Sequence, residues 1–177
     1  CSSDEIGLGG GHDGILELDA SAVNGTPAST YFKLESDTVF EIGLTPNRSD
    51  AMGHLGVALD LRAGLAAQGT KLELCRPSLE AFKVDNTNHT IEVEVTDAAA
   101  CPRYAGLTMT GIKVASSPDW LRKKLEAIGL TPVNNVVDIT NYVLHETGNP
   151  LHAFDAAKIK GNKIVVKTLK NDQKFTT

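Results

Sequence analysis

Apolar residues recur at helical spacing in three stretches of the chain, and they predict three helices. These helices occupy residues 51–68, the stretch between Ser117 and Gly129, and residues 136–147. The second begins with Ser117-Pro118-Asp119, the expected order of a cap, a proline at the first helical position and an acid in the first turn. Each helix is followed by a glycine, which easily adopts the left-handed conformation of a helix C-terminus. The third helix is the most sharply bounded, because Asn135 can cap its start and Pro150 prevents its continuation.

Shorter stretches of alternating or β-prone residues predict strands at 38–44, 71–74, 91–95, 104–114 and 163–169. The predicted fold class is α+β. We expect a small strand–helix module, followed by a mixed or antiparallel sheet with two helices packed on it.

The predicted elements and the turn-rich segments divide the chain into four parts. Residues 1–36 are rich in glycine and loops, and residues 37–75 form the strand–helix module. Residues 76–90 lack periodicity and are interpreted as a linker, and residues 91–177 hold the remaining elements.

Composition narrows the function classes only modestly. The 177 residues are 41% hydrophobic and 22% charged, as in ordinary globular proteins, and the net charge of −5 argues against a dedicated nucleic-acid-binding module. The charge is uneven: residues 1–90 carry 6 Lys/Arg against 13 Asp/Glu, and residues 91–177 carry 11 against 9. Any contact with a phosphate backbone is therefore expected from the second half. A solvated, lysine-rich strand explains this bias at least as well.

Cysteine content and hydropathy point to the cytoplasm. Cys1, Cys75 and Cys101 are far apart in sequence and form no CxxC pair, which suits reduced thiols better than a disulfide framework or a zinc site. No apolar run approaches the roughly 20 residues of a membrane span. The chain does not start with Met, so we expect it to be a piece of a longer protein.

Polar residues on the third predicted helix are the main candidates for chemistry. Asp138, Asn141 and His145 are spaced i, i+3, i+7 and share one face, with Thr140 one step round. His152 follows a Gly-Asn-Pro turn and is expected near the C-terminal half of this helix. An amide, a hydroxyl and an imidazole close together can act on an ester carbonyl. The alternative, which spacing alone favours, is a solvated helix face and a histidine that caps a loop.

Other short matches to catalytic or binding motifs are rejected because the residues around them do not fit. Gly9-x-Gly11-x-x-Gly14 matches a dinucleotide fingerprint, but a strand rather than a helix is expected after it. His145-Glu146 begins like a zinc-protease helix, but Asn149 stands where the second histidine is needed. No serine lies in a nucleophile elbow. We therefore predict no metal site and no covalent nucleophile.

Two longer stretches carry a family resemblance. NNVVDITNYV followed by GNPLHAFD closely resembles the B3/B4 editing domain of the bacterial phenylalanyl-tRNA synthetase beta-chain family. Upstream, LTPNRSDAMGHLGVALDL resembles the B1 domain of the same family, and residues 1–36 correspond to the end of its OB-like, tRNA-binding-like domain. Within the B1-like stretch we expect structural roles for Asn47, Arg48 and His54, since an arginine after a turn commonly binds a carboxylate or backbone carbonyls.

The resemblance implies a ligase that charges tRNA(Phe) and proofreads the product. The ligase site would lie on an alpha chain in an alpha2beta2 assembly that uses ATP and Mg2+, with no cofactor in this fragment. The beta module would hydrolyse tyrosine wrongly esterified to tRNA(Phe). Thr140 and Asn141 match the family's Thr-Asn pair, and His152 matches its editing histidine; His145 stands where an apolar residue is usual and receives no role.

The resemblance also limits what this fragment can do and leaves two alternatives open. The family's tyrosine-reading glutamate lies beyond Thr177, so the fragment alone is expected to be inactive. One alternative is a non-catalytic tRNA-binding or scaffold module of the synthetase. The other is a stand-alone aminoacyl-tRNA deacylase.

Overall fold

A computed structural model describes residues 1–9, 14–34, 37–171 and 173–174 of the chain. These residues form two compact units, Cys1–Phe40 and Glu41–Thr177. The first unit contains the short helices η1 (Asp4–Ile6) and α1 (Ala28–Tyr31). The Gly9-x-Gly11-x-x-Gly14 spacing falls partly on residues 10–13, which lie outside the described residues.

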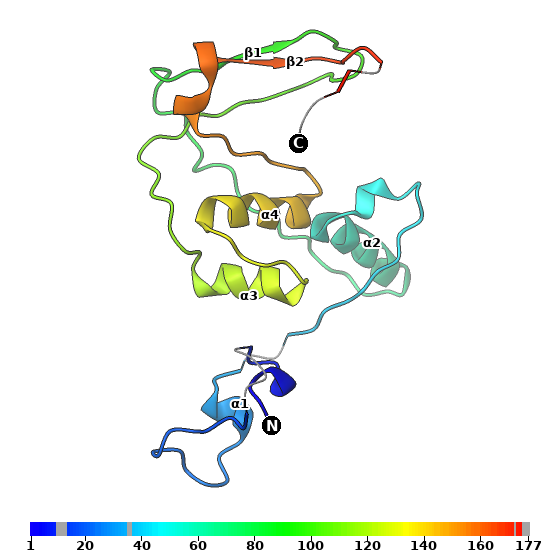
Figure 1. Ribbon diagram of the computed structural model, residues 1–177. Coiled ribbons are helices and arrows are strands. Elements are labelled where there is room, and N and C mark those ends of the chain that lie inside the picture. Colours follow the sequence, from blue (N-terminus) through cyan, green and yellow to red (C-terminus); the bar gives the residue numbers. More distant parts are fainter. Residues whose placement is uncertain (10–13, 35–36, 172, 175–177) are drawn as a thin grey trace. The chain divides into compact units, whose positions relative to one another are not determined.

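The second unit contains the longer helices and the sheet (Figure 1). In chain order its elements are η2 (Ser49–Ala51), α2 (His54–Ala67), β1 (Glu92–Val95), α3 (Asp119–Ala127), α4 (Asn135–Thr147), η3 (Ala156–Lys158), η4 (Lys160–Asn162) and β2 (Lys163–Val166). The three predicted helices correspond to α2, α3 and α4, and the α+β class is confirmed. No described helix is long and apolar enough to cross a membrane.

The sheet of the second unit pairs β1 with β2 in parallel, with Glu92 opposite Lys163 and Val95 opposite Val166. The prediction of a mixed or antiparallel sheet is therefore wrong. The two strands are separated in sequence by a crossover that includes α3 and α4, and such a connection is what parallel pairing requires. Across the strands, Lys163 Nζ lies 2.9 Å from Glu92 Oε1 and 2.7 Å from Glu94 Oε2. Hydrogen bonds to Glu94 and then Glu92 raise the pKa of Lys163.

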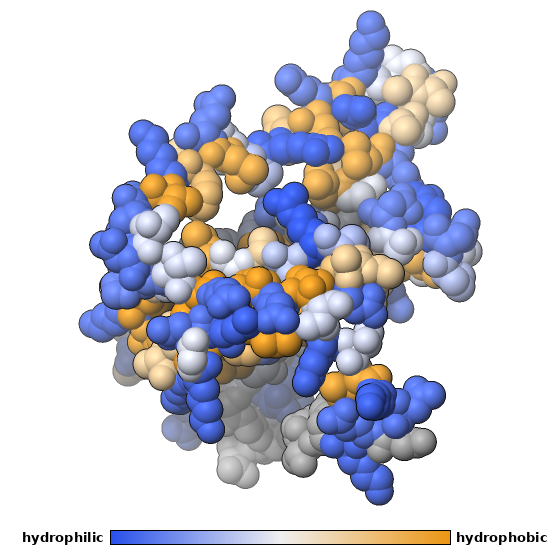
Figure 2. Space-filling view, turned by 90° about the horizontal axis from the view of Figure 1, so that it is seen from above, coloured by the Kyte–Doolittle hydropathy of each residue, from blue (hydrophilic) through white to orange (hydrophobic). Residues whose placement is uncertain are grey.

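Several predicted strands do not join a sheet. Residues 38–44, 71–74 and 104–114 contain no assigned strand. A strand is defined by its hydrogen-bonded partner, so alternation alone gives an extended, half-apolar segment and not a ladder. Apolar side chains of these segments, such as Phe40, Met109 and Ile112, are largely exposed. Figure 2 shows apolar side chains spread among charged ones on one face of the molecule.

In the second unit α3 packs against α4, and the two helices lie side by side in Figure 1. Leu121 and Leu125 of α3 are each only 1% exposed, one turn apart on the face toward α4. Trp120 and Tyr142 meet edge to face with ring centroids 5.5 Å apart. Burial, and then the charge of Glu146, raises the pKa of Tyr142. This helix pair is the platform that carries the candidate site.

Candidate functional site

The first turn of α4 is fixed by two adjacent asparagines with different tasks. Asn134 is the N-cap, and its side-chain oxygen accepts from the backbone N–H groups of Val136 and Val137, each at 3.0 Å. The expected cap, Asn135, is instead the first helical residue. Its amide donates to the carbonyl of Lys113 at 3.0 Å and accepts from the N–H of Ala115 at 3.2 Å. Asn135 therefore holds the segment before α3 against the start of α4.

Asp138 is a structural group and not part of a solvated face. Its side chain is 0% exposed, and it accepts from the Ser117 hydroxyl and, at 2.8 Å, from the N–H of Val133. Ser117 does not cap α3, whose N-cap position is Pro118, because its hydroxyl serves this carboxylate. A buried carboxylate whose oxygens are occupied in this way is not available as an acid or base toward a substrate. The solvated-face interpretation is thus wrong for Asp138.

Exposure on the other side of α4 also departs from the helical pattern. Val136, Ile139 and Val143 recur at helical spacing and would be expected to form an apolar stripe, yet Val136 and Val143 are only half-buried and Ile139 is 51% exposed. Asp138 is the buried residue of α4, and Tyr142, which contacts Trp120 of α3, is half-buried like Val136 and Val143.

Thr140 and Asn141 lie in the middle of α4 and differ in whether their side chains already have hydrogen-bond partners. The Thr140 hydroxyl donates to the carbonyl of Val137 at 2.7 Å, a bond within its own helix. Asn141 is half-buried, and no hydrogen bond among the described residues uses its amide. Successive helical residues differ by about 100° around the axis, so the two side chains leave the helix in different directions. Of the pair, Asn141 offers the uncommitted donor and acceptor.

His152 lies just beyond the C-terminal end of α4. Gly148 takes the left-handed conformation (φ 79°) and donates to the carbonyl of Leu144 at 2.8 Å, which ends the helix as predicted. Asn149 N then donates to the Thr147 hydroxyl at 3.2 Å. The His152 ring is exposed and meets Phe154 edge to face at 4.4 Å between centroids. No hydrogen bond among the described residues uses its ring nitrogens.

The structure thus puts the candidate residues on one helix and on the loop that leaves it. Thr140 and Asn141 belong to α4, and His152 follows its C-cap by four residues. Their convergence on one bound ester remains a prediction. A separate cavity of about 190 Å3 lies at the ends of β1 and β2, lined by Asp97, Ala100, Cys101, Val166, Lys167 and Thr168.

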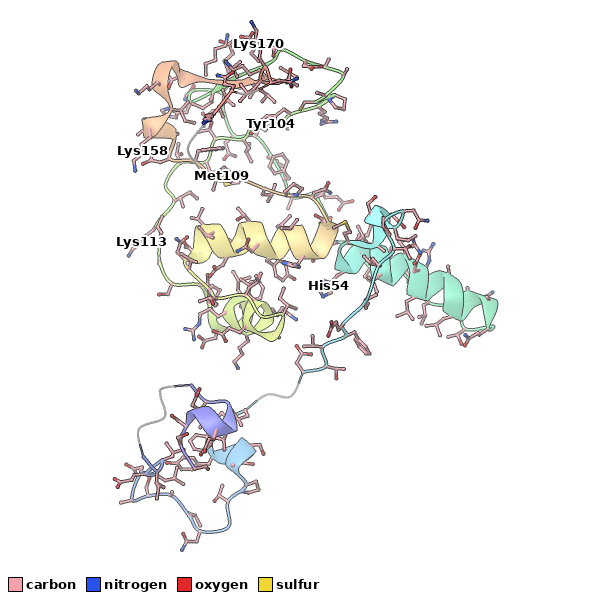
Figure 3. All side chains as sticks on the ribbon, turned by 45° about the vertical axis from the view of Figure 1, so that its right-hand side comes forward. His54, Tyr104, Met109, Lys113, Lys158 and Lys170 are labelled. Carbon is pink, nitrogen blue, oxygen red and sulfur yellow. The ribbon has the colours of Figure 1, made fainter. Side chains whose placement is uncertain are left out.

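A contact that the sequence did not reveal joins α4 to the start of α2. Nδ1 of His54, at the start of α2, lies 2.9 Å from the carbonyl oxygen of His145. Figure 3 places the labelled His54 at the junction of the two helices. The ring of His145, which received no role from the sequence, is half-buried. In the sequence, the only sign of this bond is that His54 lies in a stretch of turn residues and glycines.

The predicted structural role of Arg48 is confirmed. Its guanidinium binds the carboxylate of Asp50, with Nε to Oδ1 at 3.0 Å and Nη2 to Oδ2 at 2.9 Å, and it also binds Asp60 of α2. These hydrogen bonds raise the pKa of Arg48 and lower that of Asp50. Asn47 accepts from the Thr45 hydroxyl at 2.7 Å. The turn before α2 is thereby fastened to the helix.

Comparison with known proteins shows what the chain is similar to. Residues 100–177 match the family described as the B3/4 domain. The whole chain is 53% identical over 177 residues to the phenylalanine–tRNA ligase beta subunit of Bacteroides thetaiotaomicron, and 51% identical to that of Porphyromonas gingivalis. The beta subunit of Salinibacter ruber is 45% identical over 182 residues. Over its whole length the chain is thus about half identical to a segment of phenylalanine–tRNA ligase beta subunits, and residues 100–177 match the B3/4 domain.

The chain spans about a fifth of the length of these beta subunits, 22% of the first two and 21% of the third. The B3/4 match includes α3, α4, β2 and the loop with His152, so all three candidate residues fall inside it. The module with Arg48 and His54 lies outside that match. It is nevertheless covered by the identity to the beta subunits, which extends over the entire chain.

Proposed function

We propose that this chain is part of a phenylalanine–tRNA ligase beta subunit and contributes to the charging of tRNA(Phe) and to proofreading. The support is the identity of 53% and 51% over the full chain to two beta subunits, together with the B3/4 match. In this proposal an alpha chain completes an alpha2beta2 enzyme in the cytoplasm. ATP and Mg2+ are used by the whole ligase, outside this fragment.

Energetics explain why such a ligase needs a second site. Tyrosine differs from phenylalanine by one hydroxyl, and an apolar pocket rejects an added hydroxyl by only about a hundredfold. A separate site can offer the tyrosine hydroxyl a hydrogen-bond partner that phenylalanine cannot use, and it can then hydrolyse the wrong ester. Water attacks the ester carbonyl carbon, the ribose oxygen leaves and takes up a proton, and free tyrosine and tRNA(Phe) result.

The residues of α4 and its exit loop supply the polar groups for this reaction. Asn141, whose amide is uncommitted, binds the ester or ribose end, and Thr140, the other member of the Thr-Asn pair, precedes it on α4 with its hydroxyl bound to the Val137 carbonyl. His152, exposed beyond Gly148, positions the water or the terminal adenosine. One well-placed donor to a developing oxyanion is typically worth about 3–4 kcal/mol. The single observation behind this assignment is an uncommitted amide on a fixed helix that leads directly into an exposed histidine.

The test is His152→Ala in the full-length beta subunit assembled with its alpha chain. We expect hydrolysis of tyrosyl-tRNA(Phe) to slow by at least tenfold while the charging of phenylalanine is unchanged, because the two reactions use different sites. His89→Ala is the matched control, since His89 is an exposed histidine in a turn before β1. Equal hydrolysis by the wild type and both variants would contradict the proofreading role.

A scaffold role is the second candidate, and one feature of α4 favours it. Asn134, Asn135 and Asp138, three polar residues of the matched stretch, are all used in holding the fold together. A scaffold would still bind the acceptor end of tRNA, with exposed lysines such as Lys160 and Lys170 near the phosphates. Unchanged hydrolysis in both His152→Ala and Asn141→Ala, with weaker tRNA binding in Lys160→Ala, would favour the scaffold.

A further inference from the structure

The bond between His54 and α4 has a defined direction. A backbone carbonyl only accepts hydrogen bonds, so the Nδ1 atom that lies 2.9 Å from the His145 oxygen must carry the hydrogen. The two residues are 91 positions apart in sequence. The contact therefore joins the start of α2 to the end of the helix that carries Thr140 and Asn141.

The carbonyl that His54 reaches is one that the helix leaves without a partner. The last four carbonyls of an α-helix have no continuing turn to bind them. Here Gly148 N binds the Leu144 carbonyl, and the next backbone donor, Asn149 N, turns to the Thr147 hydroxyl. His54 supplies the missing donor to His145. The bond thus completes the C-terminal turn of α4 from another element.

The backbones at this junction are in direct contact. A Cβ added to Gly53 would lie 2.6 Å from the nitrogen of Gly148 and 3.1 Å from the carbonyl carbon of Thr147. Both atoms belong to the backbone and cannot rotate away. Only glycine lets the start of α2 approach the C-cap of α4 so closely. The position where the chain leaves α4 is therefore fixed by the residues immediately before His54.

The support behind His54 is itself rigid. A Cβ on Gly56 would lie 2.0 Å from the carbonyl oxygen of Asp50, so η2 is folded directly onto the first turn of α2. Arg48 binds both Asp50 and Asp60 and fastens the same turn from the other side. We call residues 48–56 the α2 mount. It presents His54 at a fixed place relative to α2.

We propose that His54 is a positioning residue for His152, and that the α2 mount sets the geometry of the proofreading site from outside the B3/4 match. The inference depends on the proposed function. Gly148 and His152 are four residues apart, a distance of at most about 14 Å of extended chain. A connection this short transmits a shift of its starting point to the histidine. A misplacement of about 1 Å in such a group is enough to lower a rate by as much as a hundredfold.

The decisive comparison uses three substitutions of His54 in the full-length beta subunit with its alpha chain. His54→Asn keeps an N–H donor at the position of Nδ1, His54→Gln moves the donor outward, and His54→Ala removes it. We expect His54→Ala and His54→Gln to lower kcat for tyrosyl-tRNA(Phe) hydrolysis about tenfold with little change in KM. His54→Asn should retain most of the activity, and the charging of phenylalanine should be unchanged in all three.

A double variant separates positioning from a general loss of structure. If His54 acts through His152, adding His54→Ala to His152→Ala lowers hydrolysis no further. Additive losses, or wild-type hydrolysis by His54→Ala when His152→Ala is impaired, would overturn the inference and leave the proposed function intact. Wild-type hydrolysis by His152→Ala itself would instead remove the proposed function, whatever His54 does.

Discussion

The two ends of α4 are held by different kinds of interaction. At the N-terminal end, Asn135 and Asp138 bind Lys113, Ala115, Ser117 and Val133, partners at most 22 residues away in sequence. We call these two side chains and their partners the N-terminal clamp. At the C-terminal end, α4 is held by a contact between Gly53 and Gly148 and by the side chain of His54.

Burial decides what each end contributes. The N-terminal clamp is centred on a carboxylate with no exposed surface. Removing one of its partners leaves buried polar groups without hydrogen bonds, which lowers the free energy of unfolding. His54 is exposed, so water can replace its bond at little cost to stability. The N-terminal end therefore sets how stable the helix pair is. The C-terminal end sets where the loop with His152 begins.

The largest effect is expected at the centre of the N-terminal clamp. Asp138→Ala removes the acceptor of the Ser117 hydroxyl and the Val133 N–H in a buried site, which should lower the free energy of unfolding by about 3 kcal/mol. Urea denaturation followed by circular dichroism measures this change. The matched control is Glu126→Ala, an exposed acid on α3, with an expected change below about 0.5 kcal/mol. Equal midpoints for the two variants would contradict the structural role of Asp138.

Gly53, the N-cap of α2, and Gly64, in the interior of that helix, should respond to alanine in opposite directions. At Gly53 the added methyl meets backbone atoms of Thr147 and Gly148, so we expect destabilisation of about 1–3 kcal/mol. At Gly64, in the interior of the same helix, the added methyl meets nothing within 4 Å, and the higher helix propensity of alanine should stabilise by about 0.5–1 kcal/mol. Thermal unfolding of both variants tests the pair. If Gly53→Ala stabilised the protein, the close backbone contact between Gly53 and Gly148 would be contradicted.

The cap of α4 should have an intermediate effect on the N-terminal end. Asn134→Ala leaves the N–H groups of Val136 and Val137 without their acceptor, at a cost of about 1 kcal/mol. Asn134→Ser keeps an accepting oxygen and should restore most of the loss. The same urea midpoints measure it. If alanine and serine gave the same midpoint, the side-chain cap would not contribute to stability.

The helices could be predicted from sequence because their signals are local. Apolar spacing, a polar cap and a following glycine located α2, α3 and α4 to within a few residues. The family stretches also placed Thr140, Asn141 and His152 inside the region that matches the B3/4 domain. Which of two adjacent asparagines caps α4 was beyond such a pattern, because a shift of one residue leaves it unchanged.

Partners distant in sequence account for most of the remaining errors. Ser117 has the sequence context of a helix cap, yet Asp138 on another helix takes its hydroxyl. Asp138 itself sits on the polar side of the pattern and is buried only because Ser117 and Val133 satisfy it. The direction of the sheet and the bond from His54 to His145 likewise depend on the tertiary arrangement. Periodicity contains no information about these partners.

The smallest effect concerns the α2 mount and depends on pH. Arg48 lowers the pKa of Asp50 below its ordinary value of 3.8, so the folded state favours the charged carboxylate. This contribution to stability is therefore fully present above pH of about 4 and is lost as pH falls through the lowered pKa. Asp50 is largely exposed and Arg48 is partly exposed, which keeps the effect small and sensitive to salt. Between pH 6 and pH 2, the unfolding midpoint of Asp50→Asn should fall slightly less than that of the wild type. Identical slopes at low salt would mean that the ion pair does not fasten the mount, and the C-terminal end would then be held by the close backbone contacts at Gly53 and Gly56 and by the bond from His54.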